Sequence, residues 1–272
     1  MVDSFETHAT VDDRAQNPVS VLCDASGLPA ARIKHAMTCG AVWLTRGARS
    51  ARIRRRQTVL ELGDQLHLYY NPEVLAQRPI AAELIEDAGV FSVWDKPSGV
   101  RSQGSKWGDH TTIMRWSERH LVPPRTTYTV HRLDLAASGL MVIAHSKKAA
   151  AALSAQFRAR TVAKRYRAVV RGAWPHGDAG FVIDEPIDGK SARSTVFGIR
   201  IDERGESSIV EVVIETGRKH QIRRHLADQG FPIVGDRLYG GAAKHDPDLM
   251  LRAIRLAFDH PEDGSRRRYR AD

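Results

Sequence analysis

The stretch Val130–Gly139, with the sequence VHRLDLAASG, holds the residue types best suited to chemistry. In it the carboxylate of Asp134 follows the basic side chains of His131 and Arg132, and Gly139 opens an apolar run that is typical of a buried strand. An acid placed there is shielded from bulk water, so its charge has to be stabilised by a cation or by hydrogen bonds. A shielded carboxylate can act as a nucleophile. The same pattern also fits a surface loop acid beside an arginine.

A second segment, residues 218–230, offers a cation for that acid. Its apolar residues recur at helical spacing and a glycine ends it, which predicts a short helix. On this helix Arg223 lies beside the apolar stripe, whereas Arg224 points away from it. We therefore expect Arg223 to be drawn inward, where its guanidinium needs a carboxylate and can bind it through two parallel hydrogen bonds. The alternative is a basic surface helix on RNA, with no internal partner.

Two further positions stand beside these segments. Residues 162–172 alternate as a strand, and a period of two puts Lys164 and Tyr166 on one face. A tyrosine in such a strand is most often a packing residue. Lys96, before Pro97, could be a fixed cation near a site, although a lone Lys-Pro more often marks only a turn.

Composition limits the classes of function. The 272 residues are 42% hydrophobic, which suits one large domain or two modest ones and argues against global disorder. The formal net charge of +9 favours polyanionic partners such as RNA or DNA. The only cysteines are Cys23 and Cys39, without a CxxC pair, so we expect no metal site and no disulfide framework. No signal peptide or membrane-length apolar run is visible, which predicts a cytoplasmic protein that does not enter membranes.

The chain is expected to consist of an irregular lead-in over residues 1–18, a small unit over 19–78 and a larger domain over 79–272. In the small unit a helix over 30–37, a strand over 41–44, a basic turn and a strand over 65–70 resemble the S4 RNA-binding module. Five arginines crowd the turn with no acid among them, and they are Arg49, Arg52, Arg54, Arg55 and Arg56. A solvated face is the usual meaning of such a run, but mutual repulsion favours a phosphate backbone as the counter-charge.

Taken together, the motifs of the larger domain resemble the RluA family of pseudouridine synthases. The family's His-Arg-Leu-Asp, with Ser-Gly four residues on, matches His131 to Gly139, and its Lys-x-Tyr matches Lys164 and Tyr166. Its Lys-Pro-x-Gly matches residues 96–99. Its Gly-Arg-x-His-Gln-Ile-Arg, then Gly-x-Pro-Ile-x-Gly-Asp and Tyr-Gly, match residues 217–240. Several ordered motifs across residues 83–261 argue against a chance match.

The resemblance implies an α+β fold: a mixed, mainly antiparallel sheet with helices and loops flanking a central cleft, plus the small N-terminal α/β S4-like domain. It implies Asp134 as the nucleophilic acid, Arg223 as its salt-bridge partner and Tyr166 as the aromatic wall for the target base. No cofactor is needed, because the isomerisation involves no redox change. The residues expected to contact RNA are His131, Arg132, Lys96, Lys164, Arg218, His220, Gln221 and the five arginines of the small unit.

The chain departs from the family pattern at Leu135-Ala136-Ala137, where polar groups are common, and at Arg252, where the family has His. Both departures bear on the choice of RNA. We expect 23S ribosomal RNA as the substrate, with transfer RNA as the runner-up, and a monomer without an obligate protein partner. The competing interpretations are a non-catalytic RNA-binding protein and a glycoside hydrolase. The hydrolase would usually place two carboxylates about the scissile bond.

Overall fold

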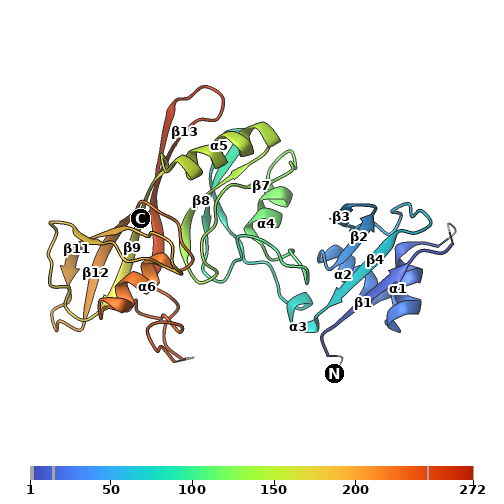
Figure 1. Cartoon of the computed structure of the whole chain (residues 1–272), viewed down its shortest axis with the longest axis horizontal. Coiled ribbons are helices and arrows are strands. Elements are labelled where there is room, and N and C mark those ends of the chain that lie inside the picture. The colour runs from blue at the N-terminus through green and yellow to red at the C-terminus, as the bar shows by residue number, and fades with distance from the viewer. Residues whose placement is uncertain (1–2, 14–15, 244, 272) are drawn as a thin grey trace. The chain divides into compact units, whose positions relative to one another are not determined.

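The computed structural model describes residues 3–13, 16–243 and 245–271 (Figure 1). It consists of two compact units: Met1–Ile80 with Gln103–Trp116, and Ala81–Ser102 with Ser117–Asp272. The fold is α+β, with mainly antiparallel strands and few helices. The sequence boundary at 78/79 is close to this division, but the return of residues 103–116 to the first unit was not foreseen. None of the described helices combines the length and the apolar character needed to cross a bilayer.

The first unit contains a four-stranded sheet in the order β1-β4-β2-β3. Its elements are β1 (Phe5–Thr10), α1 (Pro18–Ser26), α2 (Ala30–Thr38), β2 (Val42–Arg46), β3 (Arg49–Arg52), β4 (Gln65–Tyr70) and α3 (Pro72–Leu75). The predicted helix over 30–37 and strand over 65–70 are confirmed. The irregular lead-in is wrong for residues 5–10, because β1 pairs with β4 along its whole length. Residues 5–10 are only weakly hydrophobic, and they form a strand because they pair with β4. This pairing with a remote segment cannot be seen in the local sequence.

The second unit contains a ten-stranded sheet, which follows the order β10-β11-β12-β9-β13-β8-β6-β5, with β14 on β13 and β7 on β8. Its strands are β5 (Glu83–Asp87), β6 (Phe91–Lys96), β7 (Tyr128–Thr129), β8 (Ser138–Ala144), β9 (Ala163–Arg171), β10 (Phe181–Ile183), β11 (Ser194–Ile201), β12 (Ser207–Ile214), β13 (Leu251–Asp259) and β14 (Arg266–Arg270). Its helices are α5 (Lys147–Ala159) and α6 (Gln221–Asp228), while α4 (Ile113–His120) crosses the boundary between the units.

Local sequence signals explain most of these elements. The hydroxyl of Ser146 accepts a hydrogen bond from the Ala149 N–H and so caps the start of α5. The predicted strand over 162–172 is β9, and its alternation buries Tyr166. Residues 231–234 form no strand; Ile233 makes only an isolated bridge to Val170 near the end of β9.

The site depends on a close approach between β8 and β13. These two strands run parallel, and Gly139 at the start of β8 pairs with Ala253 of β13. Gly139 has φ +109°, and a Cβ there would overlap the backbone of Ala253. On its other side Ala253 pairs with Tyr166 of β9, so the three strands lie next to one another (Figure 1). The glycine of the Ser-Gly motif therefore brings the loop of Asp134 beside the strand of Tyr166.

Candidate active site

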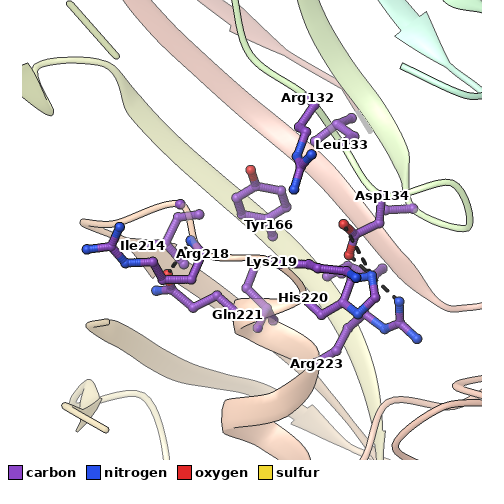
Figure 2. Close-up of a pocket in the computed structure, with 14 residues that line it drawn as sticks. Arg132, Leu133, Asp134, Tyr166, Ile214, Arg218, Lys219, His220, Gln221 and Arg223 are labelled. Atoms are coloured by element: carbon purple, nitrogen blue, oxygen red, sulfur yellow. Dashed lines mark hydrogen bonds and ion pairs between the residues drawn. The ribbon is translucent and has the colours of Figure 1, made fainter. Parts of the chain in front are cut away.

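Asp134 lies in the loop before β8, and its carboxylate faces a cavity between that loop and the start of α6 (Figure 2). One oxygen lies 3.8 Å from a terminal nitrogen of Arg223, and the other lies 3.8 Å from Nε2 of His220. The side chain is 23% exposed. Both separations exceed hydrogen-bond length, so the two oxygens remain available to a substrate group that enters the cavity.

The loop around Asp134 is fixed through its backbone. Lys96 is fully buried, and its ammonium donates hydrogen bonds to the carbonyls of Ala137 at 2.7 Å and Val100 at 2.8 Å, with Leu135 at 3.5 Å. The hydroxyl of Ser98 donates to the Ala136 carbonyl at 2.9 Å. The loop is therefore oriented by carbonyls of the Leu135-Ala136-Ala137 segment. Apolar side chains in that segment do not prevent this.

Lys96 was predicted to contact RNA, and this is wrong, since its side chain is entirely enclosed. Burial lowers the pKa of Lys96 to about 8, while the negative charges of Asp134 and Asp95 act in the opposite direction. The lysine thus positions the loop that presents Asp134. Asp95 also pairs with Arg252, the residue that replaces the family's histidine, so this departure joins β6 to β13.

Arg223 is drawn inward as predicted, but its bidentate partner is not Asp134. Its Nε and one terminal nitrogen donate to the two carboxylate oxygens of Asp236 at 2.8 and 2.7 Å. Asp236 is fully buried, and it also accepts hydrogen bonds from the backbone N–H groups of Leu238 and Tyr239. Only the remaining terminal nitrogen of Arg223 faces Asp134. The predicted ion pair between Arg223 and Asp134 is present at 3.8 Å, and only its expected pair of hydrogen bonds is corrected, because Asp236 takes that position and fixes the guanidinium.

The charges of this buried pair stay in place at neutral pH. Burial raises the pKa of Asp236, but the hydrogen bonds from Arg223 and from the backbone outweigh that effect and leave it lowered. Burial likewise lowers the pKa of Arg223, and the hydrogen bond and charge of Asp236 reverse this and leave it raised. Arg223 is therefore a permanent cation at the edge of the cavity.

Tyr166 forms a wall of the same cavity, and its ring lies across from Asp134 in Figure 2. Burial raises the pKa of its phenol above the ordinary value, and the charge of Asp134 adds to this. The hydroxyl therefore keeps its proton throughout the neutral range. Lys164 lies on the same face of β9, as the alternation predicted, and lines an adjoining cavity with Tyr166.

His220 is a neutral neighbour of Asp134. Burial lowers its pKa, and the positive charges of Arg223 and Lys219 add to this against the attraction of Asp134. Its Nδ1 lies 3.0 Å from the hydroxyl of Tyr239, and the Arg223 guanidinium lies 5.2 Å from the centre of the Tyr239 ring. His220 therefore lies beside Asp134, and its predicted contact with RNA stays a prediction.

Sequence reasoning missed Asp236 and Tyr239, the residues that support Arg223 and His220 from behind. The signal was present, because both stand in the glycine-bounded stretch 235–240 that follows α6. Gln221 was assigned to RNA, and its amide is saturated by the protein. Its oxygen accepts from Thr216 and from the Arg218 N–H, while its nitrogen donates to Ser194 and the Arg193 carbonyl. Gln221 therefore holds the turn before α6.

The cavity at Asp134 measures about 80 Å³, several times the space that a buried water requires. A cavity of this volume has room for a small group of a substrate. Among the residues predicted to contact RNA, Arg132 and Arg218 line both this cavity and the adjoining one. His131 lines only the adjoining cavity. Burial lowers the pKa of His131 to about 3, so its ring is uncharged. No cluster of three or more metal-ligating side chains occurs among the described residues.

The arginine cluster of the first unit is partly neutralised by an acid of the protein, Asp109, in addition to the phosphate counter-charge that was expected. Asp109 pairs with Arg54 at 2.5 Å and approaches Arg52 at 3.5 Å. Asp109 lies 55 residues after Arg54 in the sequence, so this ion pair could not be predicted from the residues around the cluster. In the described chain Arg49, Arg55 and Arg56 are exposed and have no ion pair.

The amino-acid sequence of the chain is similar to that of known proteins. Residues 90–228 match the family described as RNA pseudouridylate synthase. An uncharacterized RNA pseudouridine synthase of Mycobacterium bovis is 40% identical, with 74% of this chain and 73% of that protein covered. The dual-specificity RNA pseudouridine synthase RluA of Vibrio parahaemolyticus is 35% identical, with 72% and 83% covered. The ribosomal large subunit pseudouridine synthase D of Xanthomonas campestris is 38% identical, with 59% and 52% covered.

A solved structure, human RNA pseudouridylate synthase domain containing 1, aligns with a TM-score of 0.58 at 23% identity and covers 72% of this chain and 86% of its own. This likeness supports the α+β fold. The family match, together with the relatives of which more than two thirds is covered, establishes the family as well as the fold. The chain is a member of the RluA family of pseudouridine synthases, isomerases that act on RNA.

Proposed function

We propose that Asp134 is the catalytic nucleophile of this synthase and that the substrate is a uridine of 23S ribosomal RNA. One observation supports the assignment of Asp134 above all others. It is the carboxylate that faces a base-sized cavity with no hydrogen bond from the described protein residues, while Arg223 and Tyr166 border the same space.

The reaction breaks the C1′–N1 bond of uridine, turns the uracil and joins C1′ to C5. C5 releases its proton and N1 takes up a proton, so the product is an isomer of the substrate. The carboxylate of Asp134 either attacks the sugar or removes a sugar proton, and both routes need it ionised. Arg223 places a positive charge 3.8 Å from this carboxylate. Nε and one terminal nitrogen of Arg223 already donate to Asp236. The guanidinium therefore cannot form two hydrogen bonds to Asp134 that would occupy both of its oxygens.

The detached uracil has to stay in the cavity while it turns. The buried ring of Tyr166 offers an apolar wall on which a base can stack. Its phenol stays protonated, so it can donate a hydrogen bond but does not begin as a base at neutral pH. A uridine in folded RNA reaches this cavity only after leaving its stack, at a cost of roughly a few kcal/mol. Phosphate contacts to the basic surface offset that cost.

Ribosomal RNA is the substrate class that the relatives favour, since two of them are named ribosomal large subunit pseudouridine synthase D. Transfer RNA is the second candidate, and a relative named a dual-specificity RNA pseudouridine synthase is consistent with more than one RNA substrate in this family. The S4-like first unit, with its exposed arginines, would add affinity for a large folded RNA. Mapping pseudouridines by carbodiimide treatment and primer extension in a deletion strain, with and without the restored gene, decides between the two.

The role of Asp134 is tested with Asp134→Asn, which keeps the shape and removes the charge. We expect no tritium release from C5-labelled uridine RNA and unchanged affinity for that RNA. Asp202→Asn, at an exposed residue that does not line the cavity, is the control and should react like the wild type. Substantial turnover by Asp134→Asn would refute the assignment. Release of free uracil without a C-glycoside product would favour a hydrolase.

A further inference from the structure

A second cavity of about 380 Å³ adjoins the one at Asp134, and the two share Arg132, Tyr166 and Arg218 among their walls. It lies between the end of α5, the start of β9 and the turn after β12. We name it the basic pocket, because five cationic side chains line it: Arg132, Arg158, Arg160, Lys164 and Arg218. The proposed chemistry at Asp134 makes no use of Arg158, Arg160 or Lys164.

Most of these charges lack a counter-ion. Within the described part of the chain Arg132, Arg158, Arg160 and Lys164 form no ion pair, and the one acid of the wall, Glu215, pairs with Arg193 at 3.2 Å. Burial lowers the pKa of Lys164, and the charge of Arg160 lowers it further. Five cations around a cavity whose one lining carboxylate already pairs with Arg193 repel one another, and an anion inside the cavity would relieve that repulsion.

Arg160 supplies an independent observation. It ends α5 with φ 59° and ψ 26°, in the left-handed conformation that glycine adopts without strain and other residues adopt at a cost. A chain selected for stability alone would place glycine there. The arginine is kept at a strained position, and its side chain lines the basic pocket. Such strain at a cavity wall points to a functional demand on the side chain.

A plainer explanation is that cations at a helix C-terminus interact favourably with the helix dipole. Arg158 in the last turn of α5 already provides that interaction. The dipole also gives no reason for the cations of β9 and of the turn before α6, Lys164 and Arg218, to face the same cavity. Convergence of basic side chains from separate segments is better explained by a shared ligand.

We propose that the basic pocket binds the phosphate backbone of the RNA strand adjacent to the flipped uridine, with Arg160 as a positioning residue for that strand. The inference rests on the proposed function at Asp134, because it needs a polynucleotide whose base enters the neighbouring cavity. A flipped nucleotide remains tied to its chain by phosphates on both sides. A pocket that joins the catalytic cavity at Tyr166 is where such a phosphate can be held.

The test uses Arg160→Gln and Arg160→Gly in the full-length chain, with Arg204→Gln as the matched loss of one exposed charge in the β11–β12 turn. Binding of a short fluorescein-labelled oligouridylate is measured by anisotropy across potassium chloride concentrations. Both Arg160 variants should bind about fivefold more weakly at 0.1 M salt, and the salt slope should fall by about 0.7, the value for one phosphate contact to a single strand. Arg204→Gln should match the wild type.

An oligouridylate with neutral methylphosphonate linkages removes the charge from the other partner. On this probe the wild type and Arg160→Gln should bind equally, because a pair interaction disappears when either partner is neutral. A fivefold difference that persists on the neutral strand would overturn the phosphate contact.

The melting temperature shows whether Arg160→Gly loses affinity because the arginine is missing or because the fold is destabilised. Arg160→Gly should raise the melting temperature, by about 2 °C for a domain of this size, while its RNA affinity falls. Arg160→Gln keeps the strain and should melt like the wild type. A lower melting temperature for Arg160→Gly, or binding by both variants equal to Arg204→Gln, would refute the inference. Failure of the proposed function looks different, since the wild type would then release no tritium from uridine RNA.

Discussion

Replacing Asp236 by asparagine tests the arrangement in which one buried acid fixes Arg223 so that another acid stays free. The asparagine oxygen can keep the hydrogen bonds now made by Oδ1, from Arg223 and from the N–H groups of Leu238 and Tyr239. Its amide nitrogen then faces Nε of Arg223, where Oδ2 now accepts at 2.8 Å. Two donors oppose each other, and the guanidinium loses the charge that compensates its burial.

The loss of stability can be bracketed. Breaking a buried ion pair from one side costs about 3–5 kcal/mol, and the low end applies here because asparagine keeps part of the network. A loss of about 3 kcal/mol lowers the urea midpoint by about 1 M or more, at slopes of about 1–3 kcal/mol per M. Asp188→Asn is the control, because Asp188 pairs with Arg224 at 2.9 Å but is 69% exposed. It should leave the midpoint unchanged, since an exposed pair adds little stability.

Catalysis should fall for a separate reason. Without Asp236 the nearest carboxylate to Arg223 is Asp134, 3.8 Å away, and the guanidinium should close this distance to form hydrogen bonds. A hydrogen bond to a charged group is worth about 1.5–3 kcal/mol, and part of it must be broken before Asp134 can react. Tritium release should slow by about 10- to 100-fold in kcat at unchanged RNA affinity. The reasoning is refuted if Asp236→Asn unfolds and reacts like Asp188→Asn.

The remaining predictions concern a buried lysine and the exposed arginines. The pKa of Lys96 is about 8 in the folded chain against an ordinary value of 10.5, so between these values the unfolded chain binds more protons and stability rises with pH. Relative to Lys96→Met, the wild type should gain about 3 kcal/mol in the free energy of unfolding from pH 7 to pH 11, and parallel pH profiles would contradict this. Replacing Arg49, Arg55 and Arg56 by Gln should weaken RNA binding and flatten its salt slope, by about 0.7–0.9 for each phosphate that the protein no longer binds. Arg54→Gln serves as the comparison and should change the slope less, because Asp109 already neutralises that charge; equal slopes for all the variants would show that the cluster does not bind RNA.

Much of the candidate site could be predicted because its parts are encoded locally. Alternation in β9 puts Lys164 and Tyr166 on one face, and the apolar stripe of α6 turns Arg223 inward and leaves Arg224 outside. The ordered motifs then link these segments to Asp134 through the resemblance. Periodicity is a property of the backbone geometry, so it can be read from a single stretch of chain.

Partner choice could not be predicted in the same way. The sequence contains several acids that could satisfy Arg223, and only folding shows that Asp236 takes the fork while Asp134 is left open. Lys96 looked like a surface cation until packing enclosed it, and Asp109 neutralises arginines more than fifty residues away in the chain. The sequence by itself determined which side chains face inward, because that follows from local period. Which charges meet depends on distances between remote segments, and only the tertiary structure decided those.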